Sequence, residues 1–237
     1  MPNKPTQALR LLPLASVLLT ACTLTQPSLP GKKTTSPEWR EHEQKVQNLT
    51  HYQTRGSFAY ISDRKKLYAR FFWQQPSPQR YRLLLTNPLG GTELELQASP
   101  DLVQITDNQG KRYMGKDAQY MVQQLTGMAI PLDNLRQWML GLPGDAQDFT
   151  LDEHALLRSV NYQQGDQHWN VSYLSYTDGP LPLPQNLELT QGEQRIKLKM
   201  DNMDNAINHG DCKQPLAFPG QAESIFVYHR SPTGRVS

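Results

Sequence analysis

The sequence predicts a mainly β protein with some α-helix, in which one curled antiparallel sheet carries three helices on its concave side. Apolar and polar residues alternate along much of residues 52–114 and 156–200, which is the period of half-buried strands. The 18 prolines and 15 glycines are more than a helix bundle would carry and indicate many turns. At 237 residues, 37% of them hydrophobic, the chain fits one domain with short appendages.

The first 21 residues have the pattern of a secretory signal peptide. Lys4 and Arg10 give a positive start, and residues 11–21 form an uncharged apolar run. These eleven residues are too few to cross a bilayer as a helix, which needs about 20. The run ends in Leu-Thr-Ala before Cys22 and resembles the lipobox of bacterial lipoprotein precursors. That resemblance implies cleavage before Cys22, a diacylglycerol thioether on its sulfur and an N-acyl chain on its amino group.

Residues 22–36 are interpreted as a lipidated tether. Thr23 follows Cys22 at the position where an aspartate is the usual inner-membrane retention signal, so the sequence favours the outer membrane. The segment is polar, contains proline and glycine, and has no apolar period, as expected of a flexible linker. The alternative interpretation is a free cysteine after an ordinary signal peptide.

A helix is expected at the start of the body. Ser36 is a good N-cap, and Pro37 fits the first helical position because it needs no amide hydrogen there. Trp39, Val46 and Leu49 then recur at helical spacing. The pattern predicts one amphipathic helix that ends at about Leu49.

Nine or ten strands follow from the alternation, with a break at residues 75–79 that contains two prolines. In the strand at residues 92–98, for example, the leucines and Ala98 face one side while the glutamates and Gln97 face the other. The expected strands begin at residue 52 and then cover residues 67–73, 81–86, 92–98, 102–106, 111–114, 156–163, 169–176, 186–190 and 194–200.

Two short helices interrupt these strands. Asp117 can cap the first helix, which stops at Gly127. Pro131 opens the second helix, and Gly141 ends it. The apolar residues of both helices are spaced to face the sheet.

Six stretches of the body resemble the LolB family of outer-membrane lipoprotein receptors. They are residues 52–56, 68–75, 81–96, 125–128, 135–145 and 187–202, and they include long phrases rich in rare residues, such as YARFFWQQ and LRQWMLGLPGD. The resemblance covers residues 22–202, nearly all of the mature domain. It implies that residues 37–202 form an open antiparallel half-barrel of about eleven strands, with three helices that cover a hydrophobic cavity.

The same resemblance implies a function and its partners. The family accepts lipoproteins from the periplasmic carrier LolA and inserts them into the inner leaflet of the outer membrane. We therefore expect three partners, namely LolA, acylated lipoprotein cargo and that leaflet, and a monomeric receptor. The covalent diacylglycerol and N-acyl chain on Cys22 are the only groups expected, with no cofactor. A net charge of +2 gives no sign of nucleic-acid binding.

The inward face of the sheet and helices is the candidate acyl-chain cavity. Periodicity identifies an inward face but does not show whether that face encloses a void, so a plain hydrophobic core is the alternative. The candidate residues are Phe58, Tyr60, Leu67, Phe71, Trp73, Leu83, Leu85, Leu94, Leu96, Met121, Leu125, Trp138 and Met139.

The turn at residues 87–91 is the candidate membrane-insertion loop. Asparagine, proline and glycine are common in turns for backbone reasons, but a leucine at a hairpin tip is unusual. Pro88, Leu89 and Gly90 therefore present an apolar side chain where a polar one is expected. In the LolB family, a leucine in this protruding loop serves membrane insertion. The alternative is that Leu89 folds back onto its neighbours.

No catalytic or metal-binding pattern emerges. GxSxG, HExxH, GxGxxG and phosphate-loop motifs are missing, and the six histidines are scattered, so we expect neither an enzyme nor a metal site. Arg195, Lys197 and Lys199 form a basic strand face, which could attract anionic headgroups or an acidic partner, or could simply be solvated. Two other functions stay open: a lipoprotein that binds a different hydrophobic ligand, and an accessory of an outer-membrane assembly machine.

The last segment, residues 203–237, does not resemble the family. It has no clean period and contains the second cysteine, Cys212. One choice of codons, read one nucleotide later, gives a tryptophan and an early stop after Asn202. We therefore hypothesise that a single-base shift replaced the natural end with a functionless, disordered tail. Resequencing the gene across the Asn202 codon tests this hypothesis, and an intact frame there would refute it.

Overall fold

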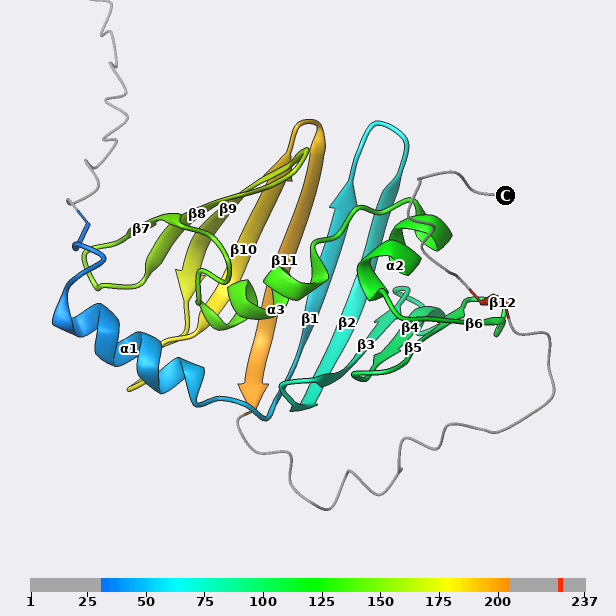
Figure 1. The fold of residues 1–237 in the computed structure, drawn as a ribbon, viewed down its shortest axis with the longest axis horizontal. Helices are drawn as coiled ribbons and strands as arrows, with labels where there is room; N and C mark the ends of the chain where they lie inside the picture. Colours follow the sequence, from blue (N-terminus) through cyan, green and yellow to red (C-terminus); the bar gives the residue numbers. More distant parts are fainter. Residues whose placement is uncertain (1–30, 205–225, 228–237) are drawn as a thin grey trace, which may run out of the picture.

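The computed structural model describes residues 31–204 and 226–227, and within these ranges the chain forms three helices and twelve strands (Figure 1). The predicted signal peptide, Cys22 and most of the tail lie outside the described residues. In chain order the elements are α1 (Pro37–Gln47), β1 (Tyr52–Ile61), β2 (Lys66–Ser77), β3 (Arg80–Thr86), β4 (Thr92–Ala98), β5 (Val103–Asp107), β6 (Arg112–Gly115), α2 (Ala118–Thr126), α3 (Leu132–Leu140), β7 (Asp148–Leu151), β8 (Leu157–Gln164), β9 (Gln167–Tyr176), β10 (Pro184–Gln191), β11 (Gln194–Asp204) and β12 (Phe226–Val227).

All the described strands belong to one sheet, in the order β12-β6-β5-β4-β3-β2-β1-β11-β10-β9-β8-β7. Neighbouring strands are antiparallel, except that β12 runs parallel to β6. The two halves of the sheet meet in its middle, where β1 pairs with β11. These strands are far apart in the sequence, and Phe58 lies opposite Leu198. The eleven strands from β1 to β11 therefore confirm the predicted open antiparallel sheet of about eleven strands.

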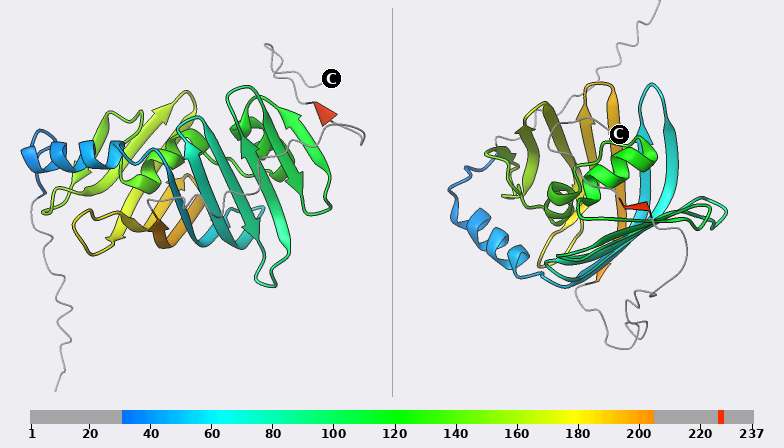
Figure 2. Two further views of the ribbon diagram at one scale, coloured as in Figure 1. Left: turned by 90° about the horizontal axis from the view of Figure 1, so that it is seen from below. Right: turned by 45° about the vertical axis from the view of Figure 1, so that its right-hand side comes forward.

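The helices lie on the concave side of this curled sheet and at its rim (Figures 1 and 2). α2 and α3 cross the concave face. α1 runs along the rim beside β7, where the Trp39 ring packs against Phe149 with the centroids 5.8 Å apart. In the left view of Figure 2 the strands of the outer face lie in front of α2 and α3, so no described helix covers that face.

The helix boundaries follow the local signals in the sequence. The Ser36 side chain accepts a hydrogen bond from the Trp39 amide at 3.3 Å, and Asp117 accepts one from the Tyr120 amide at 2.8 Å. Gly127 and Gly141 end α2 and α3 with φ values of +71° and +80°, which glycine adopts without steric cost. The four predicted boundaries at these residues are confirmed.

Several predicted boundaries differ from the structure. α1 ends at Gln47 and not at Leu49. The break predicted at residues 75–79 is shorter, because β2 continues through Pro76 at an irregularity in its pairing with β3, a position where a strand tolerates proline. The strand β7 was not predicted, since its four residues hold too few apolar side chains for an alternating pattern.

The two ends of the predicted domain also extend further than expected. At the start, the Lys32 amide donates a hydrogen bond to the Asp152 carbonyl at 2.9 Å, so the last part of the expected tether is attached to the body. At the end, β11 continues to Asp204, and β12 lies within the segment for which we predicted disorder. The other residues between 205 and 237 lie outside the described part.

Close backbone contact in the middle of the sheet explains why residue 56 is a glycine. The pairing of β1 with β11 shifts register between Arg55 and Gly56. A Cβ atom on Gly56 would overlap the backbone carbonyl of Lys199 and press on the Phe71 ring. The bulge that joins the two halves of the sheet therefore needs a residue without a side chain.

Candidate functional site

The turn at residues 87–91 presents Leu89 directly to solvent. Asn87 organises this turn, because its side-chain oxygen accepts hydrogen bonds from the Leu89 amide at 3.0 Å and the Gly91 amide at 2.9 Å. The Asn87 amide also donates to the Gly91 carbonyl at 2.8 Å, and Gly90 adopts a φ of +87°. Leu89 is left 97% exposed. It does not fold back onto its neighbours, so that alternative is wrong.

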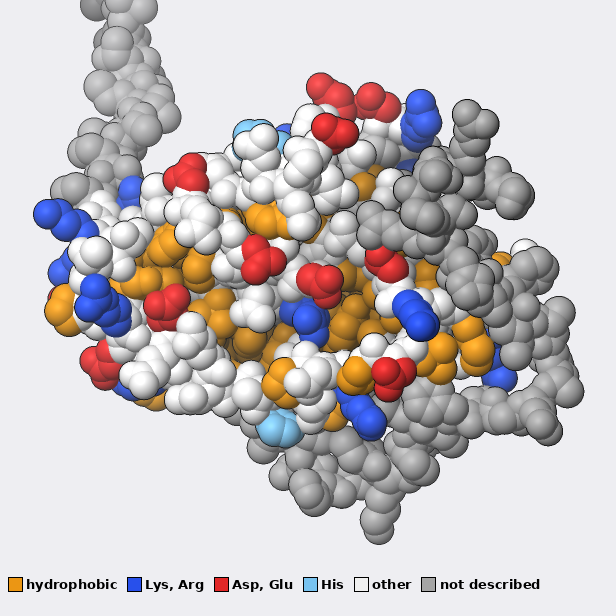
Figure 3. Space-filling view, viewed as in Figure 1, with side chains coloured by type: hydrophobic (Ala, Val, Ile, Leu, Met, Phe, Trp, Pro, Cys, Tyr) orange, Lys and Arg blue, Asp and Glu red, His pale blue; other side chains and the backbone are white. Residues whose placement is uncertain are grey.

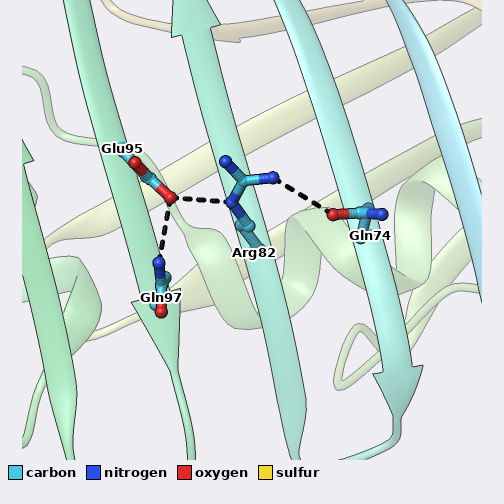
Figure 4. Close-up of polar contacts among 4 residues, drawn as sticks. All are labelled: Gln74, Arg82, Glu95 and Gln97. Carbon is cyan, nitrogen blue, oxygen red and sulfur yellow. Dashed lines mark hydrogen bonds and ion pairs between the residues drawn. The ribbon is translucent and has the colours of Figure 1, made fainter. Parts of the chain in front are cut away.

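A polar network supports the hairpin that carries this turn (Figure 4). Arg82 on β3 donates to the Glu95 carboxylate on β4 at 2.7 Å and to the Gln74 carbonyl oxygen on β2 at 3.3 Å. Gln97 donates to the same Glu95 oxygen at 2.9 Å. Burial raises the pKa of Glu95, but the hydrogen bonds from Gln97 and Arg82, with the Arg82 charge, outweigh it and hold the pKa below its ordinary value.

The inward face is mainly apolar, as predicted, with the polar Thr54 and Gln75 also buried on it, and its side chains are covered. Of the thirteen candidate cavity residues, eleven are buried, while Leu67 and Leu125 are partly buried and pack against the same cluster. Figure 3 shows apolar side chains gathered along this face between the helices, with acidic and basic side chains around them. In this structure the candidate residues of the strands and those of α2 and α3 belong to one hydrophobic cluster.

Aromatic residues that the periodicity did not single out complete this cluster. Trp73 stacks on Tyr81 with the ring centroids 4.9 Å apart, and the Arg136 guanidinium lies 4.9 Å from the centre of the Tyr81 ring. Tyr52 is fully buried beside them. Burial raises the pKa of the Tyr52 phenol, and the nearby Arg136 charge offsets part of that rise, so the hydroxyl is neutral at physiological pH.

Few polar contacts fasten the helices over the inward face. The Lys65 ammonium, in the turn between β1 and β2, donates to the Thr126 carbonyl at the end of α2 at 2.9 Å. The Tyr173 hydroxyl on β9 donates to the Trp138 carbonyl of α3 at 3.2 Å, and Arg136 donates to the Pro78 carbonyl at 3.0 Å. Apolar packing therefore provides most of the attachment of α2 and α3.

An open groove lies on the opposite, outer face of the sheet, where the sequence predicted a basic strand face but no groove. Its volume is about 520 Å³, and it crosses the strands from β2 to β9. Outward side chains line it, including Tyr68, Leu174 and Lys199, and Pro88 borders it at the end next to Leu89. The signal in the sequence was Leu174, an apolar residue at an outward position between polar ones.

The basic strand face predicted on β11 lies on this outer side. Lys197 and Arg195 both contact the Glu188 carboxylate on β10, at 3.2 and 3.1 Å. Lys199 has no ion-pair partner among the residues that the structure describes. The face is thus partly neutralised but keeps an excess of positive charge.

Residues 31–204 and 226–227 contain histidine, aspartate and glutamate side chains and the helices α1, α2 and α3. No group of three or more His, Cys, Asp or Glu side chains within these residues is placed to hold a metal ion. Each of the three helices in the same ranges is too short or too polar to span a bilayer. The predicted lipidation site, Cys22, lies outside these ranges.

Comparison with known proteins places the chain in a family. The family model "Outer membrane lipoprotein LolB" matches residues 50–202. A protein of Pectobacterium atrosepticum named outer-membrane lipoprotein LolB is 70% identical over 203 residues, which cover 85% of this chain and 98% of the relative. The protein of the same name from Serratia proteamaculans is 64% identical over the same shares.

Among solved structures, the LolA superfamily protein NE2245 from Nitrosomonas europaea aligns with 70% of this chain and 92% of its own. The TM-score is 0.46 and the sequence identity 9%. The family match includes the turn at residues 87–91 and all the strands from β1 to β10. The chain therefore belongs to the outer-membrane lipoprotein LolB family.

Proposed function

We propose that this protein is the outer-membrane receptor that accepts acylated lipoproteins from the periplasmic carrier LolA and inserts them into the inner leaflet of the outer membrane. Family membership supports the class of function. The observation that carries the proposal is Leu89, which is 97% exposed at the tip of a rigid turn while the inward apolar face is covered. A monomer moored by the acyl chains on Cys22 suits this task, and no enzymatic step is required.

The chemistry of the cargo sets the demand on the receptor. Burial of apolar chain contributes about 0.8 kcal/mol per CH₂ group, so a sixteen-carbon chain in water costs on the order of 10 kcal/mol. The periplasm supplies no ATP. Transfer must therefore run downhill, from the carrier to a receptor that binds the chains better, and then to the bilayer, which binds them best.

We assign the acyl chains to the space between the sheet and the helices α2 and α3. Because the inward face is covered in this structure, the helices must shift to admit a chain. Each helix has nine residues, and Met121 of α2, Met139 of α3 and Met128 in the connection between them are buried. Methionine side chains are unbranched and flexible, so this face can repack around a chain and close again after it leaves.

Leu89 is assigned to the release step. The hydrogen bonds of Asn87 hold Leu89 out in solvent, where it does not pack against the fold. Its exposure to water is unfavourable and is not explained by the stability of the protein. Inserted into lipid, the same side chain would bury nearly all its surface and hold the rim of the receptor against the leaflet. A chain leaving the inward face would then meet hydrocarbon and not water.

A transfer assay tests the proposal. The lipidated protein is mixed with carrier that is loaded with an acylated lipoprotein, and the cargo is followed by co-purification with and without liposomes. We expect the cargo to move to this protein without ATP and to the liposomes when they are present. Binding of free phospholipid without acceptance of the lipoprotein would instead support a different hydrophobic ligand, and failure to bind either would support an assembly accessory.

A further inference from the structure

Three large apolar side chains stand out as exposed in the described part of the chain, and they lie in or next to one groove on the outer face. Leu89 is 97% exposed, Leu174 63% and Tyr68 59%. Tyr68 and Leu174 line the outer groove, and Pro88, next to Leu89, borders it. Single exposed apolar residues are ordinary, but their concentration along one groove indicates a contact surface.

The groove arises from the register of the strands. On β1 the outward residues Ser57 and Ala59 are small and form the floor. Tyr68 pairs with Ala59 from one side, and Lys199 pairs with Ser57 from the other, so larger side chains rise on both sides of that floor. Leu174 lies on β9, four strand spacings or about 19 Å from Tyr68. The surface is therefore broad and shallow.

The charges beside these apolar residues are mainly positive. Arg70, Lys197 and Lys199 line the groove, against one acidic residue, Glu188. Arg70 is paired at 2.7 Å with Asp201, and Lys197 at 3.2 Å with Glu188. Lys199, near the centre of the groove, has no ion-pair partner among the described residues. The apolar side chains at the two ends, with Lys197 and Lys199 of β11 between them, match an anionic phospholipid surface.

We infer that the outer face of β2, β1, β11, β10 and β9 lies on the bilayer and contacts anionic phospholipids. In this orientation Tyr68 and Leu174 lie at the boundary between headgroups and acyl chains, where amphipathic and apolar side chains are stable. Lys199 reaches the lipid phosphates, and Leu89 enters more deeply. This inference rests on the proposed function for the insertion of Leu89. It adds that the outer face of the sheet also contacts the membrane.

The orientation has a consequence for cargo transfer. The helices α2 and α3 lie on the concave side of the sheet (Figure 2), opposite the outer face that carries the groove. When the outer face rests on the membrane, these helices face the periplasm, where a soluble carrier can approach them. The lipid anchor then limits the distance of the domain from the membrane. The contact of the outer face with the membrane determines which side of the domain faces the carrier.

Lipid contact can be measured at single positions of the full lipidated chain in vesicles. Cys212→Ser removes the second thiol, and since Cys22 is expected to carry lipid on its sulfur, an introduced cysteine is then the reactive one. An environment-sensitive fluorophore is attached at Leu174→Cys, at Leu89→Cys and at Asp133→Cys, an exposed α3 position on the helix side. The vesicles contain phosphatidylethanolamine, phosphatidylglycerol and a spin-labelled lipid that quenches fluorescence on contact.

We expect a blue shift and loss of fluorescence at positions 174 and 89 but not at position 133. Quenching at 89 with none at 174 would overturn the inferred orientation while leaving the insertion loop intact. No quenching at 89 would count against the proposed release step itself. A response at 174 that appears only when carrier protein is added would also overturn the inference, because the face would then bind a protein.

The charge component has its own test. Lys199→Gln should lower the population of the membrane-bound orientation roughly fivefold. This is measured as weaker quenching at position 174 in phosphatidylglycerol vesicles. The same substitution should have little effect in vesicles of phosphatidylcholine alone. Lys45→Gln, on the exposed side of α1, is the matched control. Equal quenching in Lys199→Gln and the parent protein would exclude the assigned role of Lys199.

Discussion

The Lys65 ammonium reaches the Thr126 carbonyl across 2.9 Å and so ties the β1–β2 turn to the end of α2. Gln119 and Gln167 form a second, longer contact of 3.5 Å between α2 and the sheet. These two contacts are polar links of α2, which packs against α3 and β5. Because these links are few and neither is fully buried, α2 can be lifted from the inward face at low cost.

Loss of the first link should therefore loosen α2. In Lys65→Met, which keeps most of the side-chain length, amide hydrogen exchange in residues 118–126 should be roughly fivefold faster, since one hydrogen bond contributes about 1 kcal/mol. Hydrogen exchange followed by mass spectrometry measures this rate. Lys66→Met changes the neighbouring, outward lysine and should leave the exchange of α2 as it is. Equal effects of the two substitutions would remove the assigned role of the Lys65 contact.

Leu89→Glu should separate acceptance of cargo from its release. The side chain makes no packing contact, so the fold and the transfer of cargo from the carrier should be unchanged. Release into liposomes should be blocked, because a carboxylate at the tip resists entry into hydrocarbon. Cargo that co-purifies with the receptor after incubation with liposomes measures the block. Normal release from Leu89→Glu would show that this loop has another role.

Two leucines give a matched test of where the apolar residues act. Leu96 is fully buried on β4, whereas Leu89 is exposed. Leu96→Ala should lower the free energy of unfolding by about 2–5 kcal/mol, the range for a buried leucine. Leu89→Ala should change it by less than about 0.5 kcal/mol. Urea unfolding measures both values. A small effect at Leu96 would mean that the inward face is loosely packed and already has room for a chain.

Sequence patterns predicted the elements whose signals are local. Asp117 and Gly127 mark α2 because capping depends on a few neighbouring residues, and the alternation in β4 gave the correct inward face. The outer groove could not be predicted in this way. Its lining comes from β2, β1, β11, β10 and β9, and only the long-range pairing of β1 with β11, which sets Ser57 opposite Lys199, brings them together.

The exposure of Leu89 was predicted correctly, since an apolar residue in a tight turn has few neighbours to cover it. The closure of the inward face was left open, because alternation shows which side chains point inward but not how far α2 and α3 approach them. Tyr52 and Tyr81 were missed as members of that face because they lie at strand ends, where the alternating pattern is shortest.

Stability should depend on pH through Glu95. Its pKa in the folded state is below the ordinary value of 4.5. The stabilisation is therefore fully present above about pH 4.5 and is lost as the pH falls through the folded pKa. Glu95→Gln should cost about 1 kcal/mol at pH 7 and less at pH 3.5, as measured by urea unfolding. Glu193→Gln, in the exposed β10–β11 turn, is the control. An effect of Glu95→Gln that is constant with pH would contradict this account.

The position of the acyl chain during transfer is the most direct measurement. A lipoprotein that carries photoreactive fatty acids is passed from the carrier to this protein, irradiated, and the modified residues are located by mass spectrometry. Adducts should form on the inward face, at residues such as Trp73, Leu96 and Met121, and decrease when liposomes are added. Adducts confined to Tyr68 and Leu174 on the outer face would contradict the proposed binding site.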